Sequence, residues 1–281
     1  MVEKKCVEID QQQSQTKNKL SAEQWQALIA LHRTLLHEHH DFSQHPSASP
    51  ALRRLVTKYA MPARMWRHGI HSFLELLRHR LPSSLDHMLA FVYLAYSMMA
   101  LLMESVPSFL ETWIECLGDL ARYRMAIEEA DDRDRKIWSG VARMWYNKAA
   151  DRSPNVGRIQ NHLAVLARPN IVQQLFYYSK ALVSVVPFIN ARESIMLLFT
   201  PFLEGIETAI QKHSSVEVAI VTANGILFTH GSINRYVSLM DQVVEVLDSH
   251  IARTSAKFRV QGPELVSSLI TATLIRSTIK P

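Results

Sequence analysis

The chain has 281 residues, of which 48% are apolar and 20% are charged, a composition typical of globular proteins. Its 8 glycines are few for this length, which argues against a sandwich or barrel, because those folds need many turns with positive φ. The formal charge of +5 and the pI near 9.2 favour anionic partners, but the 31 basic residues are spread along the chain and do not select one class.

The chain opens with a polar segment. Residues 1–19 contain no apolar stretch, so neither a secretory signal nor a membrane anchor is expected, and a disordered lead-in is predicted. Ser21 and Gln24 then form a capping box ahead of an apolar-periodic stretch that begins at Trp25. The segment DFSQHPSASP at 41–50 ends this helix.

Prolines mark most of the later helix starts, because a missing N–H costs nothing in the first turn. They are Pro62, Pro82, Pro107, Pro154, Pro169, Pro187, Pro201 and Pro263. Between them we expect helices near 51–60, 63–80, 84–104, 108–129, 132–150, 156–167, 170–185, 190–212, 232–257 and 263–279. The stretch 216–230 opens with β-branched residues and would also suit a strand, although its neighbours favour a helix. The uncharged run 88–103 is shorter than the roughly 20 residues that span a bilayer, which predicts a buried core helix.

Two helix pairs carry a repeat signal of the tetratricopeptide type, in which small residues stand where helices cross closely. The first copy consists of Leu117, Gly118, Ala142, Tyr146, Ala149 and Pro154, with a link longer than usual at EEADDRDRKIWS. A looser copy consists of Leu163, Ala164, Gln174, Tyr178, Ala181 and Pro187. Such units stack on one another and form a concave, peptide-binding surface.

Signs of catalysis or metal binding are weak. Cys6 and Cys116 are far apart, so neither a disulfide framework nor a zinc site is expected. Neighbouring residues of the cluster HEHH at 37–40 point in different directions on a helix, which favours a solvated helix end over a metal site. The chain contains no phosphate loop, nucleophile elbow or H-E-x-x-H motif. We therefore expect no enzyme activity, no cofactor and no metal.

Three blocks go beyond generic helical repeats: TWIECLGDLARYR at 112–124, WYNKAADRSPNVGRIQNHLAVLA at 145–167 and QQLFYYSKALVSVVPFINARESIMLLF at 173–199. Together they resemble the telomerase-subunit and nonsense-mediated-decay adaptor family, in its filamentous-fungal branch. The resemblance extends over roughly residues 50–257 and includes AMPARMWRHGI at 60–70 and LDSHIARTSAKF at 247–258.

This resemblance implies an all-α fold, a 14-3-3-like and tetratricopeptide-like right-handed helical superhelix. It implies a 14-3-3-like half over 20–150, with tetratricopeptide-like hairpins. The helical-hairpin half over 151–281 is the start of the family's DNA/RNA-binding-type region. After about 262 the chain departs from the pattern, by truncation or divergence, and no nuclease domain of the PIN type is present.

The resemblance also implies a phosphate site. The Arg-Tyr step of GDLARYR matches Arg122 and Tyr123, and an arginine offers two-pronged donation to phosphate oxygens. The second basic element aligns with His71, where the decay adaptors carry a lysine, and Arg67 one turn earlier can substitute for it. The alternative is that Arg122 pairs with Asp119 or Glu115 on a solvated helix face.

The leading interpretation is a non-enzymatic adaptor that binds a phosphorylated protein, such as an RNA-decay helicase, in RNA decay or telomere maintenance. A second is a telomerase or decay component that binds RNA or telomeric DNA through a basic helical surface, with contacts from Arg143, Lys148, Arg152, Arg158 and Arg168. Scattered surface charge is the simpler account of these five residues. A third is a degenerate scaffold without a working phosphate pocket. All three imply a protein of the nucleus, the cytoplasm or both, with no membrane partner.

Overall fold

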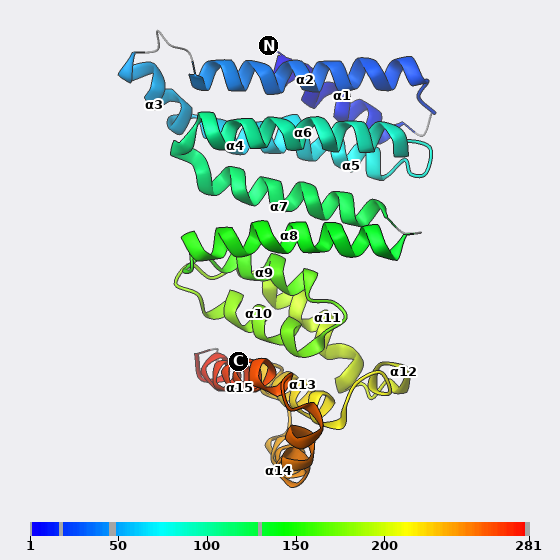
Figure 1. Ribbon diagram of the computed structural model, residues 1–281, viewed down its shortest axis with the longest axis vertical. Coiled ribbons are helices and arrows are strands. Elements are labelled where there is room, and N and C mark those ends of the chain that lie inside the picture. Colours follow the sequence, from blue (N-terminus) through cyan, green and yellow to red (C-terminus); the bar gives the residue numbers. More distant parts are fainter. Residues whose placement is uncertain (1, 17–18, 45–48, 129–130, 279–281) are drawn as a thin grey trace. The chain divides into compact units, whose positions relative to one another are not determined.

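A computed structural model describes residues 2–16, 19–44, 49–128 and 131–278. Every element in these ranges is a helix, and the β-type pairing that they contain is an isolated bridge between Val156 and Val186 (Figure 1). The predicted all-α class is therefore confirmed. The chain divides into two compact units, Met1–Lys148 and Ala149–Pro281, close to the boundary at 150 that the resemblance implies. The right-handed superhelix stays a prediction.

The first unit contains α1 Val2–Gln15, α2 Ala22–Gln44, α3 Pro50–Lys58, α4 Met61–Arg64, the π-helical η1 Met65–His71, α5 Ser72–Arg78, α6 Leu85–Ser105, the 3-10 turn η2 Pro107–Phe109, α7 Leu110–Ile127 and most of α8 Asp132–Arg152. Helix α6 lies between α2 and α7 and packs against both (Figure 1). The predicted capping box starts α2: the backbone N–H of Gln24 donates to Ser21 Oγ at 3.3 Å, and the Ser21 N–H donates to Gln24 Oε1 at 2.9 Å.

Helix α6 is central to the core of the first unit. It is the one helix in the described ranges long and apolar enough to cross a membrane, judged by length and composition. Its Phe91, Ala95 and Met99 are nevertheless fully buried, among side chains from α2, α5 and α7. This burial agrees with the core helix predicted over 88–103.

The second unit contains α9 Gly157–Leu166, α10 Ile171–Val183, α11 Ala191–Leu203, α12 Glu207–Ile210, α13 Ser215–Phe228, α14 Ile233–Thr254 and α15 Phe258–Thr278. Side-chain caps begin three of these helices, at Asn170, Ser214 and Ser232. Its core centres on Tyr178 and Phe199, both almost fully buried. The ambiguous stretch 216–230 is helical over nearly its whole length, as its neighbours indicated.

The predicted disordered lead-in is wrong for most of its length. Residues 2–15 form α1, while residues 1, 17 and 18 lie outside the described ranges. The segment is polar, but one of its faces buries Cys6 and Asp10 against other helices. Contacts that are distant in sequence therefore hold a helix that local apolar periodicity did not reveal.

Other boundaries also differ. The helix predicted over 190–212 is broken after α11, where Gly205 adopts a φ of 73°, a conformation that glycine accepts without strain. Pro201 and Pro263 lie inside α11 and α15 and do not begin them. The helix predicted over 63–80 is interrupted by the π-helical η1. Positions 129 and 279, the expected ends of two helices, lie outside the described residues.

The first tetratricopeptide-like pair packs as its small residues predict. A Cβ on Gly118 would lie 2.7 Å from the Tyr146 ring, so α7 and α8 approach more closely than any larger residue allows. Ala142 and Ala149, on the same side of α8 as Tyr146, are buried with it. This close crossing fixes the position of Arg122, one turn after Gly118 on α7.

Candidate functional site

Arg122, Asp119 and Tyr146 form a ring of three hydrogen bonds between α7 and α8. Nε of Arg122 donates to the Tyr146 hydroxyl at 3.3 Å, and its Nη2 donates to Oδ1 of Asp119 at 3.3 Å. Tyr146 donates to the same Oδ1 at 2.6 Å. Burial lowers the pKa of Arg122, but Tyr146 and Asp119 outweigh this effect and raise it above its ordinary value. Arg122 is thus a permanent cation already paired with Asp119, as the alternative interpretation predicted, but the pair includes a buried carboxylate between two helices and does not lie on a solvated helix face.

Tyr123 also has an internal partner. Its side chain is buried, and its hydroxyl donates to Oε1 of Glu75 at 2.7 Å. Burial, reinforced by Glu75, raises the pKa of Tyr123 well above its usual value. Glu75 pairs in addition with Arg78 at 2.6 Å. An incoming phosphate would therefore have to replace a carboxylate at the Tyr123 hydroxyl.

The π-helical η1 carries the other two residues of the predicted phosphate site. The His71 ring lies edge-on to the Tyr123 ring, with centroids 6.3 Å apart, and the Arg122 guanidinium lies 5.7 Å from the centroid of the Tyr123 ring. Arg67 is exposed on η1. His71, Tyr123 and Arg122 are therefore neighbours, while their role in phosphate binding stays a prediction.

Sequence reasoning missed Glu75. Its position four residues after His71 puts both on one helix face, which was a readable sign of an acidic group near the predicted site. Its bond to Tyr123, 48 residues away, could not be read from the sequence, because it depends on how α5 packs near α7.

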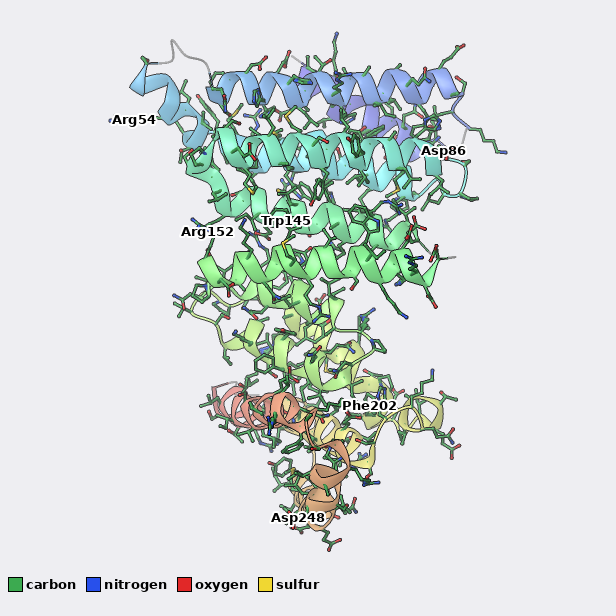
Figure 2. The ribbon with its side chains drawn as sticks, in the orientation of Figure 1. Arg54, Asp86, Trp145, Arg152, Phe202 and Asp248 are labelled. Carbon is green, nitrogen blue, oxygen red and sulfur yellow. The ribbon has the colours of Figure 1, made fainter. Side chains whose placement is uncertain are left out.

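Three of the predicted nucleic-acid contacts lie on α8. Lys148 and Arg152 are exposed and share one helix face. Arg143 is half-buried and, nine residues before Arg152, lies on roughly the opposite side of the helix axis. The three residues therefore do not form a single stripe on α8. The Lys148 ammonium lies 5.3 Å from the ring centroid of Trp145, whose Nε1–H donates to Tyr96 at 2.7 Å. Figure 2 shows Trp145 near the middle of α8 and Arg152 at its end.

The second unit supplies the other two predicted contacts. Arg158 on α9 and Arg168 after it are exposed, and Arg168 hydrogen-bonds to the buried Tyr178. From Arg143 to Arg192 the chain has seven lysines and arginines and one acidic residue, Asp151. This segment is far more basic than the rest of the chain, in which acidic and basic residues nearly balance. Such an excess is typical of a surface that contacts phosphates.

The HEHH cluster was predicted to be a solvated helix end, and this is wrong for one member. His39 is 5% exposed and faces Glu3 of α1 across a distance of 3.7 Å. His40 hydrogen-bonds instead to Asp41 at 3.0 Å. The two histidines thus serve different partners, as their directions on a helix require.

Comparison with known proteins places the basic segment in a family context. Residues 142–273 match the model of the Est1 DNA/RNA binding domain, which covers just under half of the chain. The match begins within α8 and includes all five predicted nucleic-acid contacts.

Two curated proteins are similar over shorter stretches. The telomerase-binding protein EST1A of Danio rerio is 38% identical over 86 residues, which is 30% of this chain and 5% of that protein. The EST/SMG-like protein 2 of Saccharomyces cerevisiae is 25% identical over 127 residues, 44% of this chain and 10% of that protein. The domain match and both relatives confirm the predicted resemblance to the telomerase-subunit and nonsense-mediated-decay adaptor family, while the filamentous-fungal branch stays a prediction.

Proposed function

We propose that this chain is a non-enzymatic component of a telomere-maintenance or RNA-decay assembly, and that its second unit binds RNA or DNA through exposed arginines. The observation that carries the proposal is the agreement between the Est1 DNA/RNA binding domain, matched over 142–273, and the basic segment from Arg143 to Arg192. Its similarity to a telomerase-binding protein and to an EST/SMG-like protein supports a role in telomere maintenance or RNA decay. Such a component works in the nucleus, the cytoplasm or both.

Charge is the physical basis of this binding. A cation that neutralises a nucleic-acid phosphate releases a condensed counterion, so affinity falls as salt rises. Arg152, Arg158 and Arg168 are exposed within the matched domain and are suited to such contacts. Affinity of this kind depends on the number of contacts and only weakly on base sequence.

The test is a titration of the full chain with single-stranded RNA and DNA oligonucleotides at several salt concentrations. Replacing Arg152, Arg158 and Arg168 together by glutamate should weaken binding by more than about tenfold and lower the salt slope by about two. The matched control replaces three other exposed arginines of the same domain, Arg235, Arg253 and Arg259. Equal losses in both triple variants would show that net charge alone governs binding, and would refute the proposed surface.

A second candidate function is the binding of a phosphorylated protein, such as an RNA-decay helicase, at Arg122, Tyr123 and His71. The observation that favours it is that the His71 ring and the Arg122 guanidinium both lie beside the ring of Tyr123. Asp119 and Glu75 oppose it, because each offers a negative charge where phosphate would bind. Phosphate binding there requires that these carboxylates be displaced.

A further inference from the structure

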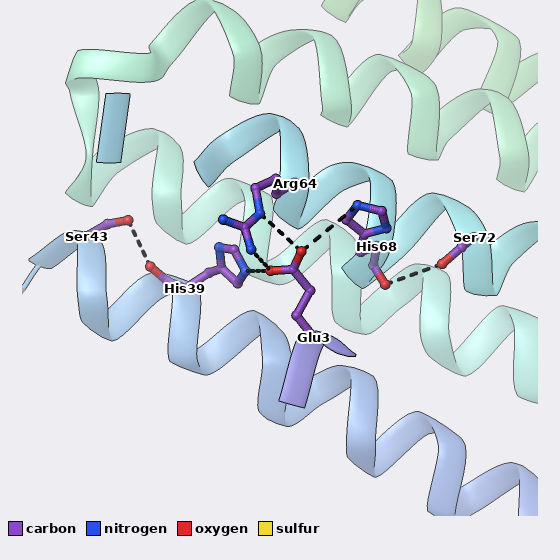
Figure 3. Close-up of polar contacts among 6 residues, drawn as sticks. All are labelled: Glu3, His39, Ser43, Arg64, His68 and Ser72. Carbon is purple, nitrogen blue, oxygen red and sulfur yellow. Dashed lines mark hydrogen bonds and ion pairs between the residues drawn. The ribbon is translucent and has the colours of Figure 1, made fainter. Parts of the chain in front are cut away.

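Figure 3 shows a carboxylate of α1 among basic side chains of three other elements. Arg64, at the end of α4, donates from Nε to Oε1 of Glu3 at 3.1 Å and from Nη2 to Oε2 at 2.7 Å. Nε2 of His39, on α2, lies 3.7 Å from Oε2, and Nε2 of His68, on η1, lies 4.0 Å from Oε1. The Glu3 side chain is 19% exposed. These groups have the composition of an anion-binding site.

The Glu3 carboxylate fills this site incompletely. Arg64 binds both carboxylate oxygens, while the two imidazole nitrogens lie beyond hydrogen-bond length from them. Burial lowers the pKa of His39 in spite of the nearby Glu3, so one carboxylate does not offset the desolvation of an imidazolium. A larger anion with a second negative charge would complete the site.

The helix that supplies Glu3 is held by polar contacts as well as by its buried Cys6 and by Ile9, which packs against the core of the first unit. Asp10 accepts a hydrogen bond from Ser72 at 2.6 Å and lies 3.2 Å from His32. Arg80 donates to the backbone carbonyls of Gln13 and Thr16 at 2.6 and 2.9 Å. Water can replace such contacts at far lower cost than it can replace buried apolar surface. Loss of the anchor at Glu3 should therefore loosen the first turns of α1, where Cys6 lies, while the contacts of Asp10 and Arg80 still hold the rest of the helix.

We propose that Arg64, His39 and His68 form a binding site for a phosphate monoester, and that α1 occupies this site through Glu3 until the phosphate displaces that side chain. The site lies on residues other than Arg122, Tyr123 and His71, and does not depend on either candidate function above. A phosphate monoester carries close to two negative charges at pH 7 and offers three terminal oxygens. A nucleic-acid phosphodiester carries one charge and two free oxygens, so the three bases favour the monoester.

The two cysteines provide a direct measure of α1 displacement. Cys6 is fully buried on α1, and burial raises the pKa of its thiol to about 12, so it should react slowly with iodoacetamide. Cys116, buried on α7, is the internal reference. The full chain is titrated with inorganic phosphate at constant ionic strength, and the alkylation of each cysteine is measured by mass spectrometry. Phosphate should raise the Cys6 rate several-fold and leave the Cys116 rate unchanged.

Three variants separate the site from the helix that covers it, with phosphate binding measured by equilibrium dialysis. Glu3→Gln should raise the Cys6 rate without phosphate and bind phosphate about fivefold more tightly. Arg64→Gln should also raise that rate but lose phosphate binding. Arg80→Gln is the matched control, because it loosens the other end of α1 and leaves the site intact. It should therefore retain phosphate binding.

Two results would overturn the proposal: equal phosphate affinity in Arg64→Gln and Arg80→Gln, or phosphate binding that leaves Cys6 protected in the unmutated chain. An RNA oligonucleotide that raises the Cys6 rate at lower phosphate-group concentration than inorganic phosphate would overturn the choice of a monoester. The variant Arg122→Gln should keep the full Cys6 response. Loss of the response in that variant would assign the effect to the second candidate function, against the present proposal.

Discussion

Asp119 controls the charge available at Arg122. Its Oδ1 accepts from both Tyr146 and Arg122, so one buried carboxylate fixes the direction of the guanidinium and balances its charge. A phosphate can gain Arg122 only by competing with this carboxylate. The strength of that competition decides whether Arg122 and Tyr123 form a working phosphate site or belong to a scaffold without one.

We predict that Asp119→Asn tightens the binding of a phosphoserine peptide about fivefold, because it removes the competing charge and keeps the shape of the side chain. Arg122→Gln should abolish the preference for the phosphorylated peptide. Arg124→Gln is the control, since Arg124 flanks Tyr123 on the other side and pairs with Glu128. Fluorescence anisotropy with the phosphorylated and unphosphorylated peptides gives the affinities, and circular dichroism checks the helical content.

Equal affinity for the two peptides in both the unmutated chain and Asp119→Asn would contradict a phosphate site at Arg122 and favour the degenerate scaffold.

The sequence predicted the hydrogen bonds around Arg122 only in part. The pair between Arg122 and Asp119 follows from an i,i+3 spacing on one helix. The third member, Tyr146, is 27 residues from Asp119 and enters only because α7 and α8 cross closely at Gly118.

At the scale of elements, the start of α9 depends on one glycine. A Cβ on Gly157 would lie 2.3 Å from the carbonyl oxygen of Ala181 and 2.9 Å from the backbone nitrogen of Phe188. The Gly157 N–H donates to the Val186 carbonyl at 2.9 Å, and the Phe188 N–H donates to the Ala181 carbonyl at 3.0 Å. The first turn of α9 is thus pressed against the backbone at the end of α10, where no side chain fits.

We predict that Gly157→Ala destabilises the second unit by about 2 kcal/mol or more, because backbone cannot move aside as a flexible side chain can. Gly140→Ala is the matched control: that glycine lies within α8 with nothing near its missing Cβ, so alanine should be neutral or stabilise by up to about 1 kcal/mol. Urea unfolding followed by circular dichroism measures both. Equal midpoints for the two variants would contradict the close approach at Gly157.

Elements were predictable from the sequence where their signals are local. Ser21 with Gln24 announced α2, and the gap after α11 is explained in retrospect by Gly205. Helix α1 was missed because the ion pair that anchors it joins Glu3 to Arg64, 61 residues later. No periodicity within α1 reports a contact of that kind.

At the scale of the whole molecule, the described residues form two large buried clusters. The buried cluster around Phe73 and Phe91 consists of residues between Trp25 and Tyr123, all in the first unit. The cluster around Tyr178 and Phe199 consists of residues between Ala164 and Leu265, all in the second. These buried clusters share no residue, so loss of packing in one core removes no contact from the other.

We therefore predict that the two units lose structure separately. Phe73→Ala and Phe199→Ala are a matched pair, because each removes an almost fully buried ring and should cost its own unit about 3–5 kcal/mol. Hydrogen exchange read peptide by peptide should show faster exchange of α5 and α6 in the first variant and of α10 and α13 in the second. Faster exchange throughout the chain in either variant would mean that the units unfold as one. Separate unfolding would leave the nucleic-acid surface of the second unit intact in Phe73→Ala, so RNA affinity in that variant offers an independent check at the level of function.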